Sequence, residues 1–264
     1  MKNLRRVPCW PFPHPVLQLP DDEVHVWRAT VDLPAPQQAI LHETLSAEER
    51  ERAAHFVCSV HRDRFAAARG ILRDILSRYT KIPPQALAFR YGPGGKPAVL
   101  PGYGPEDLQF NISHSGELAL YAVSWKRQLG IDVERIRESS SWEKIAERFF
   151  SPVETAALRN LLATERTATF FRYWTCKEAW AKAVGARLSW SLGAVDVAVE
   201  PARPATVLAV CGDTTATSKW SLVELPVGTD YAAALVVEGG GWKLVLWQWD
   251  GVRGFPHVGL SGAG

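Results

Sequence analysis

Two acidic residues lie two positions apart in the segment GIDVE, residues 130–134. The segment alternates like a β-strand, so Asp132 and Glu134 should point to the same face. Two neighbouring carboxylates repel each other unless a cation lies between them, and oxygen ligands of this kind suit Mg²⁺ completed by water and substrate phosphates. The alternative is a solvent-facing acidic pair on an amphipathic strand, and the spacing alone favours that alternative.

A third acid lies in RYWTCKEAWAKAVG, residues 172–185, between Lys177 and Lys182. On a helix, Trp174, Glu178 and Lys182 share one stripe. A helix-stabilising Glu178–Lys182 pair is the simple alternative, but it does not explain the surrounding tryptophans and alanines. Glu178 is therefore a candidate metal ligand or general base, and the two lysines are candidate phosphate ligands.

Hydroxyl and imidazole groups end the segment FNISHS, residues 110–115. Ser113 and His114 could form a phosphate-binding corner if the imidazole is protonated or donates a hydrogen bond. A surface histidine in a hairpin turn is the alternative. The segment does not predict a serine hydrolase, because these two neighbours cannot form a nucleophile–base pair with an orienting acid.

A glycine turn, GPGGKP at residues 92–97, contains Lys96 and could approach a flat ring or a phosphate closely. It is not a Walker A loop, because no Gly-Lys-Ser/Thr opens a helix there. Several arginines follow on predicted helices and form a solvated face by default, although one or two could reach a phosphate. These arginines are Arg52, Arg62, Arg64, Arg69 and Arg73.

The elements that must position these residues occur in two rounds of similar order. The first round consists of a strand at 23–33, a capped helix from Ser46, a long helix at 61–84, a hairpin at 86–100 and two strands within 108–125. The second consists of a strand at 129–136, a capped helix from Ser151, a long helix at 167–185 and strands at 194–200, 220–226, 231–238 and 242–249. The two capping serines are about 105 positions apart, which indicates an internal repeat.

The repeat predicts an α+β protein with two similar halves. The N-terminal half would span 1–124, including an extended arm at 1–22, and the C-terminal half 125–264, including a loop-rich tail after about residue 240. A cleft between two such halves is a usual place for a ligand.

Composition excludes several classes of protein. The chain has 264 residues, of which 47% are hydrophobic and 22% charged, and a formal net charge of +2, so nothing favours bulk nucleic-acid binding. Its four cysteines form no C-x-x-C pair, which fits a reducing compartment. The basic start is followed by prolines rather than an apolar segment, and no run approaches a membrane span. We therefore expect a cytoplasmic protein.

In combination and order, these motifs resemble the Sfp-type 4′-phosphopantetheinyl transferases. The family signature G-x-D-x-E, F-F-x-x-x-E and W-x-x-K-E-x-x-x-K is matched by GIDVE, by FFSPVE at 149–154 and by WTCKEAWAK at 174–182. GGKP at 94–97 and FNISHS add to the match, which extends over roughly residues 23–240. The resemblance implies two α+β halves related by a pseudo-twofold axis, each a small sheet packed on a long helix, with the active site in the cleft between them.

The resemblance also implies the reaction. Coenzyme A would donate 4′-phosphopantetheine to a serine of an apo acyl or peptidyl carrier protein, giving adenosine 3′,5′-bisphosphate, with Mg²⁺ or Mn²⁺ bound. Asp132, Glu134 and Glu178 would hold the metal, and Glu178 and Lys182 would be catalytic. The residues implied to bind coenzyme A are Arg52, Arg64, Gly95, Lys96, Pro97, Ser113, His114, Lys177 and Lys182.

Two other classes use some of the same residues: a Mg²⁺-dependent phosphodiesterase or nuclease, with water as nucleophile, and a non-catalytic coenzyme A-binding protein. The complete carboxylate set favours catalysis over binding alone. Which carrier protein is served, from fatty-acid, polyketide or peptide synthesis, stays open. Single-chain members of this family with this length are usually monomers, so the resemblance implies a monomer. We expect no nucleic-acid partner and no membrane partner.

Overall fold

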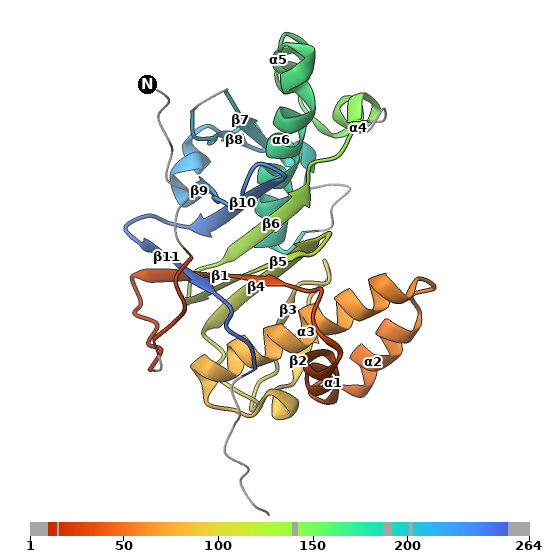
Figure 1. Cartoon of the computed structure of the whole chain (residues 1–264). Helices are drawn as coiled ribbons and strands as arrows, with labels where there is room; N and C mark the ends of the chain where they lie inside the picture. Colours follow the sequence, from red (N-terminus) through yellow and green to blue (C-terminus); the bar gives the residue numbers. More distant parts are fainter. Residues whose placement is uncertain (1–9, 15, 139–141, 187–191, 201–202, 253–264) are drawn as a thin grey trace, which may run out of the picture.

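The computed structural model of the protein describes residues 10–14, 16–138, 142–186, 192–200 and 203–252. Runs of helices and runs of mostly antiparallel strands follow one another along the chain (Figure 1), which confirms the predicted α+β class. The helices are α1 (Ala35–Glu43), α2 (Ala47–Ala54), α3 (Ser59–Thr80), α4 (Trp142–Phe149), α5 (Pro152–Arg159), α6 (Ala163–Val184) and the 3₁₀ turns η1 (Pro84–Ala86), η2 (Leu192–Ala194) and η3 (Thr215–Lys219). Parts of the predicted arm and tail lie outside the described residues.

The strands form two main sheets and two ribbons. They are β1 (Glu23–Thr30), β2 (Phe89–Tyr91), β3 (Pro97–Val99), β4 (Leu108–Ser115), β5 (Leu118–Trp125), β6 (Leu129–Arg135), β7 (Val195–Ala198), β8 (Thr206–Val210), β9 (Trp220–Glu224), β10 (Tyr231–Glu238) and β11 (Lys243–Gln248). The first sheet has the order β11-β1-β5-β4 and the second β6-β10-β9, while β2-β3 and β7-β8 form the ribbons.

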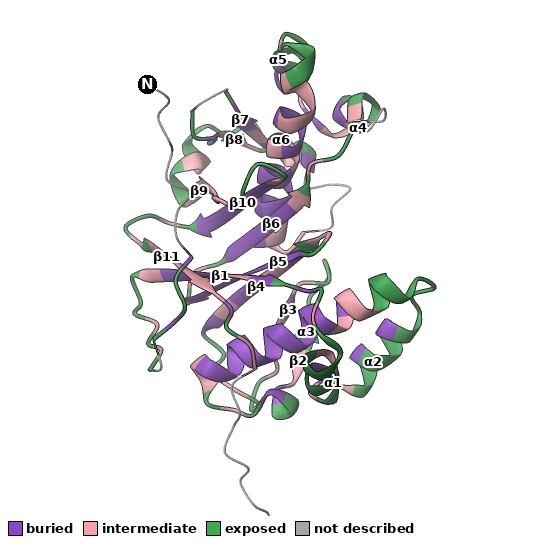
Figure 2. Cartoon of the chain, viewed as in Figure 1, coloured by how far each residue is buried: buried purple, intermediate pink, exposed green. Residues whose placement is uncertain are grey.

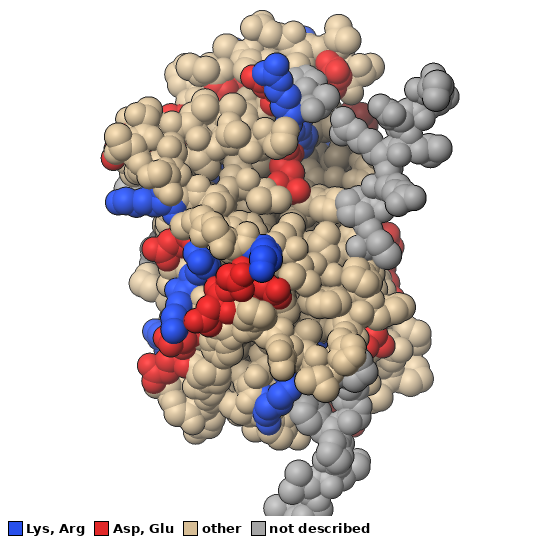
Figure 3. All heavy atoms as spheres, turned by 90° about the vertical axis from the view of Figure 1, so that its left-hand side faces the viewer, with Lys and Arg blue, Asp and Glu red and all other residues tan. Residues whose placement is uncertain are grey.

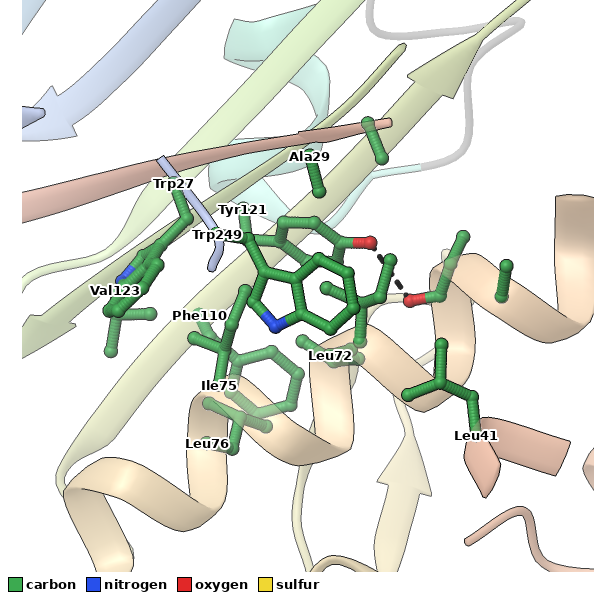
Figure 4. Packing of buried hydrophobic residues seen from close by; sticks show 14 of the residues in the cluster. Trp27, Ala29, Leu41, Leu72, Ile75, Leu76, Phe110, Tyr121, Val123 and Trp249 are labelled. Atoms are coloured by element: carbon green, nitrogen blue, oxygen red, sulfur yellow. Dashed lines mark hydrogen bonds between the residues drawn. The ribbon is translucent and has the colours of Figure 1, made fainter. Parts of the chain in front are cut away.

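The two sheets lie between the two long helices, α3 and α6 (Figure 1). Alternate residues of the first sheet pack on α3, where the Tyr121 hydroxyl donates to the Ala68 carbonyl oxygen (Figure 4). The second sheet packs on α6. The remaining faces of both sheets share a third core, in which Leu120 and Leu235 are fully buried. The central strands are accordingly buried along most of their length (Figure 2).

The last described strand returns to the first sheet. Residues 243–248, which the predicted division assigns to the C-terminal half, form β11 and pair in parallel with β1. Trp249 then enters the core beside α3, where its indole N–H donates to Asp74. The end of the described chain therefore ties the second half to the first.

The two predicted capping boxes are confirmed, and each has a second, buried role. Glu49 closes the box at Ser46 and also forms ion pairs with Arg69 and Arg73 of α3. Glu154 closes the box at Ser151 and accepts an ion pair from Lys177 of α6. In both halves a capping glutamate thus fixes the start of a short helix to the long helix that follows it.

The structure places Lys177, which was predicted to contact coenzyme A, in the core of the second half. Its side chain is 0% exposed, and its ammonium donates to both carboxylate oxygens of Glu154 and to the Val195 carbonyl oxygen. A buried ammonium requires a counter-charge and satisfied donors, and Glu154 and Val195 supply both. On α6, the Lys177 side chain points into the core, whereas the side chain of its neighbour Glu178 points in a different direction.

We expect Lys177→Met to lower the free energy of unfolding by about 3–5 kcal/mol, because it leaves the Glu154 carboxylate buried without its counter-charge. The double variant with Glu154→Gln should recover part of that loss. Denaturant unfolding measures both effects, and Lys144→Met, at an exposed position of α4, is the control. A single variant as stable as the wild type would contradict this role of the pair.

Candidate active site

The strand that carries Asp132 and Glu134 approaches α6 unusually closely. A Cβ atom on Gly130 would lie 2.1 Å from the Ala179 carbonyl oxygen and 2.3 Å from the Ala183 nitrogen, both in α6. No side chain fits in that space, so the first position of GIDVE must be glycine. Because side chains alternate along β6, the positions that follow on the same face, Asp132 and Glu134, also point toward α6.

The three predicted metal carboxylates are close enough to interact. The pKa of Glu178 is raised to about 7, mainly by burial and also by the Asp132 and Glu134 charges, while Lys182 opposes the shift. Burial also raises the pKa of Glu134, against a hydrogen bond from Ser115. Only 6% of Glu178 is exposed. The fold therefore gathers negative charge in a poorly solvated place, as general bases often require.

Lys182 is bonded to this acidic cluster. Its ammonium lies 2.6 Å from Asp132 Oδ1 and 3.0 Å from the Ser113 hydroxyl oxygen, and Ser113 also donates to Asp132 Oδ1 at 2.8 Å. In place of the alternative i, i+4 pair with Glu178, Lys182 forms an ion pair with Asp132 that joins α6 to β6. Lys182 is partly exposed and can also face a ligand in the cleft.

The chemistry of the donor set fits a divalent metal ion. Three carboxylates supply the hard oxygen donors that Mg²⁺ prefers. Asp132 Oδ2 is buried and has no hydrogen-bond partner in the described part of the chain, which leaves one lone-pair-bearing oxygen to be satisfied. Within those same residues, no three His, Cys, Asp or Glu side chains converge in ligating geometry. To hold a metal together, the three carboxylates would have to move closer to one another, and Asp132 Oδ2 is the oxygen of Asp132 that has no other partner.

Next to the cluster lies a cavity of about 330 Å³, which we call the first cavity. It brings together predicted coenzyme-binding residues that are far apart in sequence. They are Arg52, Gly95, Lys96, Pro97, Ser113, His114 and Lys182. The glycine turn seals one wall, since a Cβ atom on Gly94 would lie 2.4 Å from the Gly185 carbonyl oxygen.

Lys96 lines the first cavity and also joins the two halves. Its ammonium donates to the carbonyl oxygens of Leu129, at 2.8 Å, and Ala183, at 3.1 Å. Burial lowers the pKa of Lys96 to about 8. The lysine therefore holds the glycine turn against the last turn of α6, which carries Lys182.

Arg64 lies elsewhere, in a second cavity of about 560 Å³. Its guanidinium makes two 2.7 Å hydrogen bonds to Asp32. His114 lines both cavities, and its pKa is lowered by desolvation and by the positive charges of Lys182, Arg64 and His61. A neutral imidazole can still donate a hydrogen bond, which is one of the two predicted modes for His114.

Two residues of the site were given no role of their own from the sequence: Asn111 was not singled out, and Ser115 counted only as the second hydroxyl of the Ser-His-Ser corner. The Asn111 side-chain oxygen accepts the Ile131 N–H, and the Ser115 hydroxyl donates to Glu134. Both lie in FNISHS, two positions before and two positions after Ser113, so the three side chains share one face of β4. The polar alternation Asn-x-Ser-x-Ser on an otherwise buried strand was the available signal.

Carboxylates, a lysine and a histidine gathered beside a cavity are groups that phosphoryl-transfer enzymes use. Residues 27–126 match the family described as "4′-phosphopantetheinyl transferase, N-terminal", and residues 128–236 the "4′-phosphopantetheinyl transferase superfamily". The chain is 42% identical over 235 residues to the 4′-phosphopantetheinyl transferase HetI of Nostoc sp., covering 89% of this chain and 96% of the relative. It is 31% identical over 167 residues to a 4′-phosphopantetheinyl transferase of Bacillus subtilis, covering 62% and 71%. The chain belongs to the 4′-phosphopantetheinyl transferase family, which confirms the resemblance found in the sequence.

Glu178→Gln should make the metal-free protein more stable at pH 8 than the wild type. The raised pKa means that folded Glu178 keeps its proton up to about pH 7, whereas unfolded Glu178 loses it above its ordinary pKa of 4.5. The stability that this group contributes is therefore present below pH 4.5 and is lost as the pH rises through 7. Glutamine does not titrate, so its advantage should grow over that window to as much as about 3 kcal/mol.

Denaturant unfolding in excess chelator at pH 5 and pH 8 measures this effect. Glu143→Gln, at an exposed position of α4, is the control and should show little change at either pH. A Glu178→Gln variant with the same advantage, or none, at both pH values would show that Glu178 does not titrate in this window.

Proposed function

We propose that this chain transfers 4′-phosphopantetheine from coenzyme A to a serine of an apo acyl or peptidyl carrier protein and releases adenosine 3′,5′-bisphosphate. The activity is that of the family to which the chain belongs. The observation that carries the proposal is the contact between the acidic cluster and the first cavity through Lys182 and Ser113.

The first cavity is suited to the nucleotide end of coenzyme A. The glycine turn offers a wall without side chains, which a flat ring can approach closely. Arg52 lies exposed at this cavity, over the Phe65 ring, and can meet the 3′-phosphate. Ser113, His114 and Lys182 line the part of the cavity that leads to the acidic cluster, where they can donate to the pyrophosphate.

In the reaction, the serine oxygen bonds to the β-phosphorus of coenzyme A, and the bond from that phosphorus to the oxygen of the leaving nucleotide breaks. Glu178, with a pKa near 7, can take the serine proton. Lys182 can stabilise charge on the pyrophosphate oxygens once it releases Asp132. A Mg²⁺ ion held by Asp132, Glu134 and Glu178 would neutralise the same charge.

The acceptor serine must arrive opposite the leaving nucleotide, because attack on phosphorus is in line. The second cavity is suited to this approach, since it shares His114 with the first cavity and contains Ser115, which is bonded to Glu134. Arg135 and Arg137, which line this cavity, are exposed. Phe56 also lines it, and the next residue in the sequence, Val57, is fully exposed. Such a surface fits a partner with acidic and apolar groups around its serine.

The two halves support the finer fold proposal, a pseudo-twofold relation. Each main sheet begins with a strand, here β1 or β6, that pairs with the second strand of a later hairpin, β5 or β10. Each half also has a short capped helix whose N3 glutamate pairs with a cation of the long helix, Arg73 or Lys177. A duplicated α+β unit accounts for both.

The remaining expectations concern location and partners. The described cysteines, Cys58, Cys176 and Cys211, are free thiols, which supports a cytoplasmic location. In the described part of the chain, no helix is both long and apolar enough to cross a membrane. The face in Figure 3 carries Lys and Arg interspersed with Asp and Glu, rather than a broad basic surface for nucleic acid. We propose a monomer that acts on coenzyme A and a carrier protein.

The decisive experiment incubates the protein with coenzyme A, Mg²⁺ and a panel of apo carrier proteins, and reads the products by intact mass. We expect a phosphopantetheine adduct that disappears in excess chelator and returns with Mg²⁺ or Mn²⁺. Glu178→Gln should lower kcat by about 10²–10⁴-fold, because it removes a general base. Lys182→Ala should raise the KM for coenzyme A and slow transfer less severely.

Two outcomes would contradict these assignments. Near-normal turnover in Glu178→Gln would exclude Glu178 as the base. Hydrolysis of coenzyme A without adduct formation would instead favour the phosphodiesterase alternative.

The 3′-phosphate contact is tested separately with Arg52→Ala. Loss of a charge-assisted hydrogen bond costs about 1.5–3 kcal/mol, so kcat/KM for coenzyme A should fall by about 10–150-fold. The same variant should use 3′-dephospho-coenzyme A as well as the wild type does. Equal losses with both donors would show that Arg52 does not read the 3′-phosphate.

A further inference from the structure

The two main sheets meet along strands β4 and β6, which are edge strands of their own sheets and lie in contact. Three polar side chains of β4, at alternate positions, bridge this junction: Asn111, Ser113 and Ser115. Alternate positions of a strand share one face, so the three form a side-chain ladder where a main-chain ladder would otherwise run. The ladder satisfies groups that two edge strands would leave open.

Ser115 ends this ladder in a fixed orientation. The Arg135 N–H donates to its hydroxyl oxygen at 3.1 Å, and the hydroxyl lies 2.6 Å from Glu134 Oε2. A serine hydroxyl has one hydrogen to donate and two acceptor lone pairs. Since the N–H uses an acceptor position, the single hydrogen is free to point at the Glu134 carboxylate.

We propose that Ser115 is a positioning residue, which holds the Glu134 carboxylate in the acidic cluster through one hydrogen bond while it is itself held by the backbone of β6. This inference rests on the proposed function. Glu134 is otherwise a long side chain near the end of β6, and its neighbour Arg135 is exposed. A carboxylate ligand that is oriented by an outer hydrogen bond loses less entropy when it binds a metal ion.

Asn111 supports the same strand from the other end of the ladder. Its buried side chain accepts the Ile131 N–H at 2.9 Å, so it fixes which residue of β6 lies opposite it. A slip of one residue would turn Asp132 and Glu134 away from α6, because side chains alternate in direction. Asn111 therefore fixes the register, and Ser115 orients the last carboxylate.

The test compares Ser115→Ala with Ser115→Thr, which keeps the hydroxyl and can place its methyl group toward the second cavity, which Ser115 lines. Ser124→Ala is the matched control, because Ser124 is a buried serine of the neighbouring strand whose hydroxyl donates to the Arg127 carbonyl oxygen, at the far end of the hairpin. Mn²⁺ binding is measured by electron paramagnetic resonance with coenzyme A present, together with melting temperature and the kinetics of transfer.

We expect Ser115→Ala to weaken Mn²⁺ binding by about 10-fold or more, with the KM for coenzyme A changed by less than about twofold. Ser115→Thr and Ser124→Ala should bind Mn²⁺ like the wild type. In a Glu134→Ala background, Ser115→Ala should have no further effect on Mn²⁺ binding, because the oriented group is gone.

Unchanged Mn²⁺ binding in Ser115→Ala would overturn the inference alone, provided that the wild type binds Mn²⁺ and transfers phosphopantetheine. An equal loss in the Glu134→Ala background would also overturn it, since Ser115 would then act by another route. A wild type that neither binds Mn²⁺ nor transfers would overturn the proposed function and this inference with it.

Discussion

The close contact between the backbone of β6 and the backbone of α6 is the constraint on which the site depends. It is possible because Gly130 has no side chain to separate them. The contact places Asp132 on the strand directly against Lys182 on the helix, and it brings both within electrostatic reach of Glu178. A larger residue at position 130 would force the two elements apart and would move every charged group of the cluster.

Buried ion pairs that lie outside the first cavity hold the helices in place around that contact. Lys177 precedes Glu178 on α6 and binds Glu154, which also caps α5. In the first half, Glu49 ties α2 to α3 in the same way through Arg73. A buried ion pair contributes little net stability against apolar alternatives, but it is strongly unfavourable to break. Such pairs therefore suit a fold that must hold one arrangement of its helices.

The sequence was sufficient for elements whose signals are local. The capping boxes at Ser46 and Ser151 and the strand carrying Asp132 could be predicted from spacing alone. The direction of Lys177 could not be, because a lysine beside a candidate base looks the same whether it faces a ligand or a core. The place of β11 beside β1 was equally hidden, since a parallel pairing over such a sequence distance leaves no local pattern.

The two lysines on either side of Glu178 have different roles because their side chains point in different directions, and not because of their distance from Glu178 in the sequence. Lys177 points inward and is neutralised by Glu154, whereas Lys182 points across the junction and is neutralised by Asp132. Neither ammonium is committed to Glu178, whose carboxylate is left with a pKa near 7 among other acids. That state is unfavourable for the folded protein alone, and a cation or a proton relieves it. The rest of α6 is mostly apolar and well anchored in the core. The helix can therefore hold the Glu178 carboxylate, whose charge is unfavourable there, at the position where a reacting group needs it.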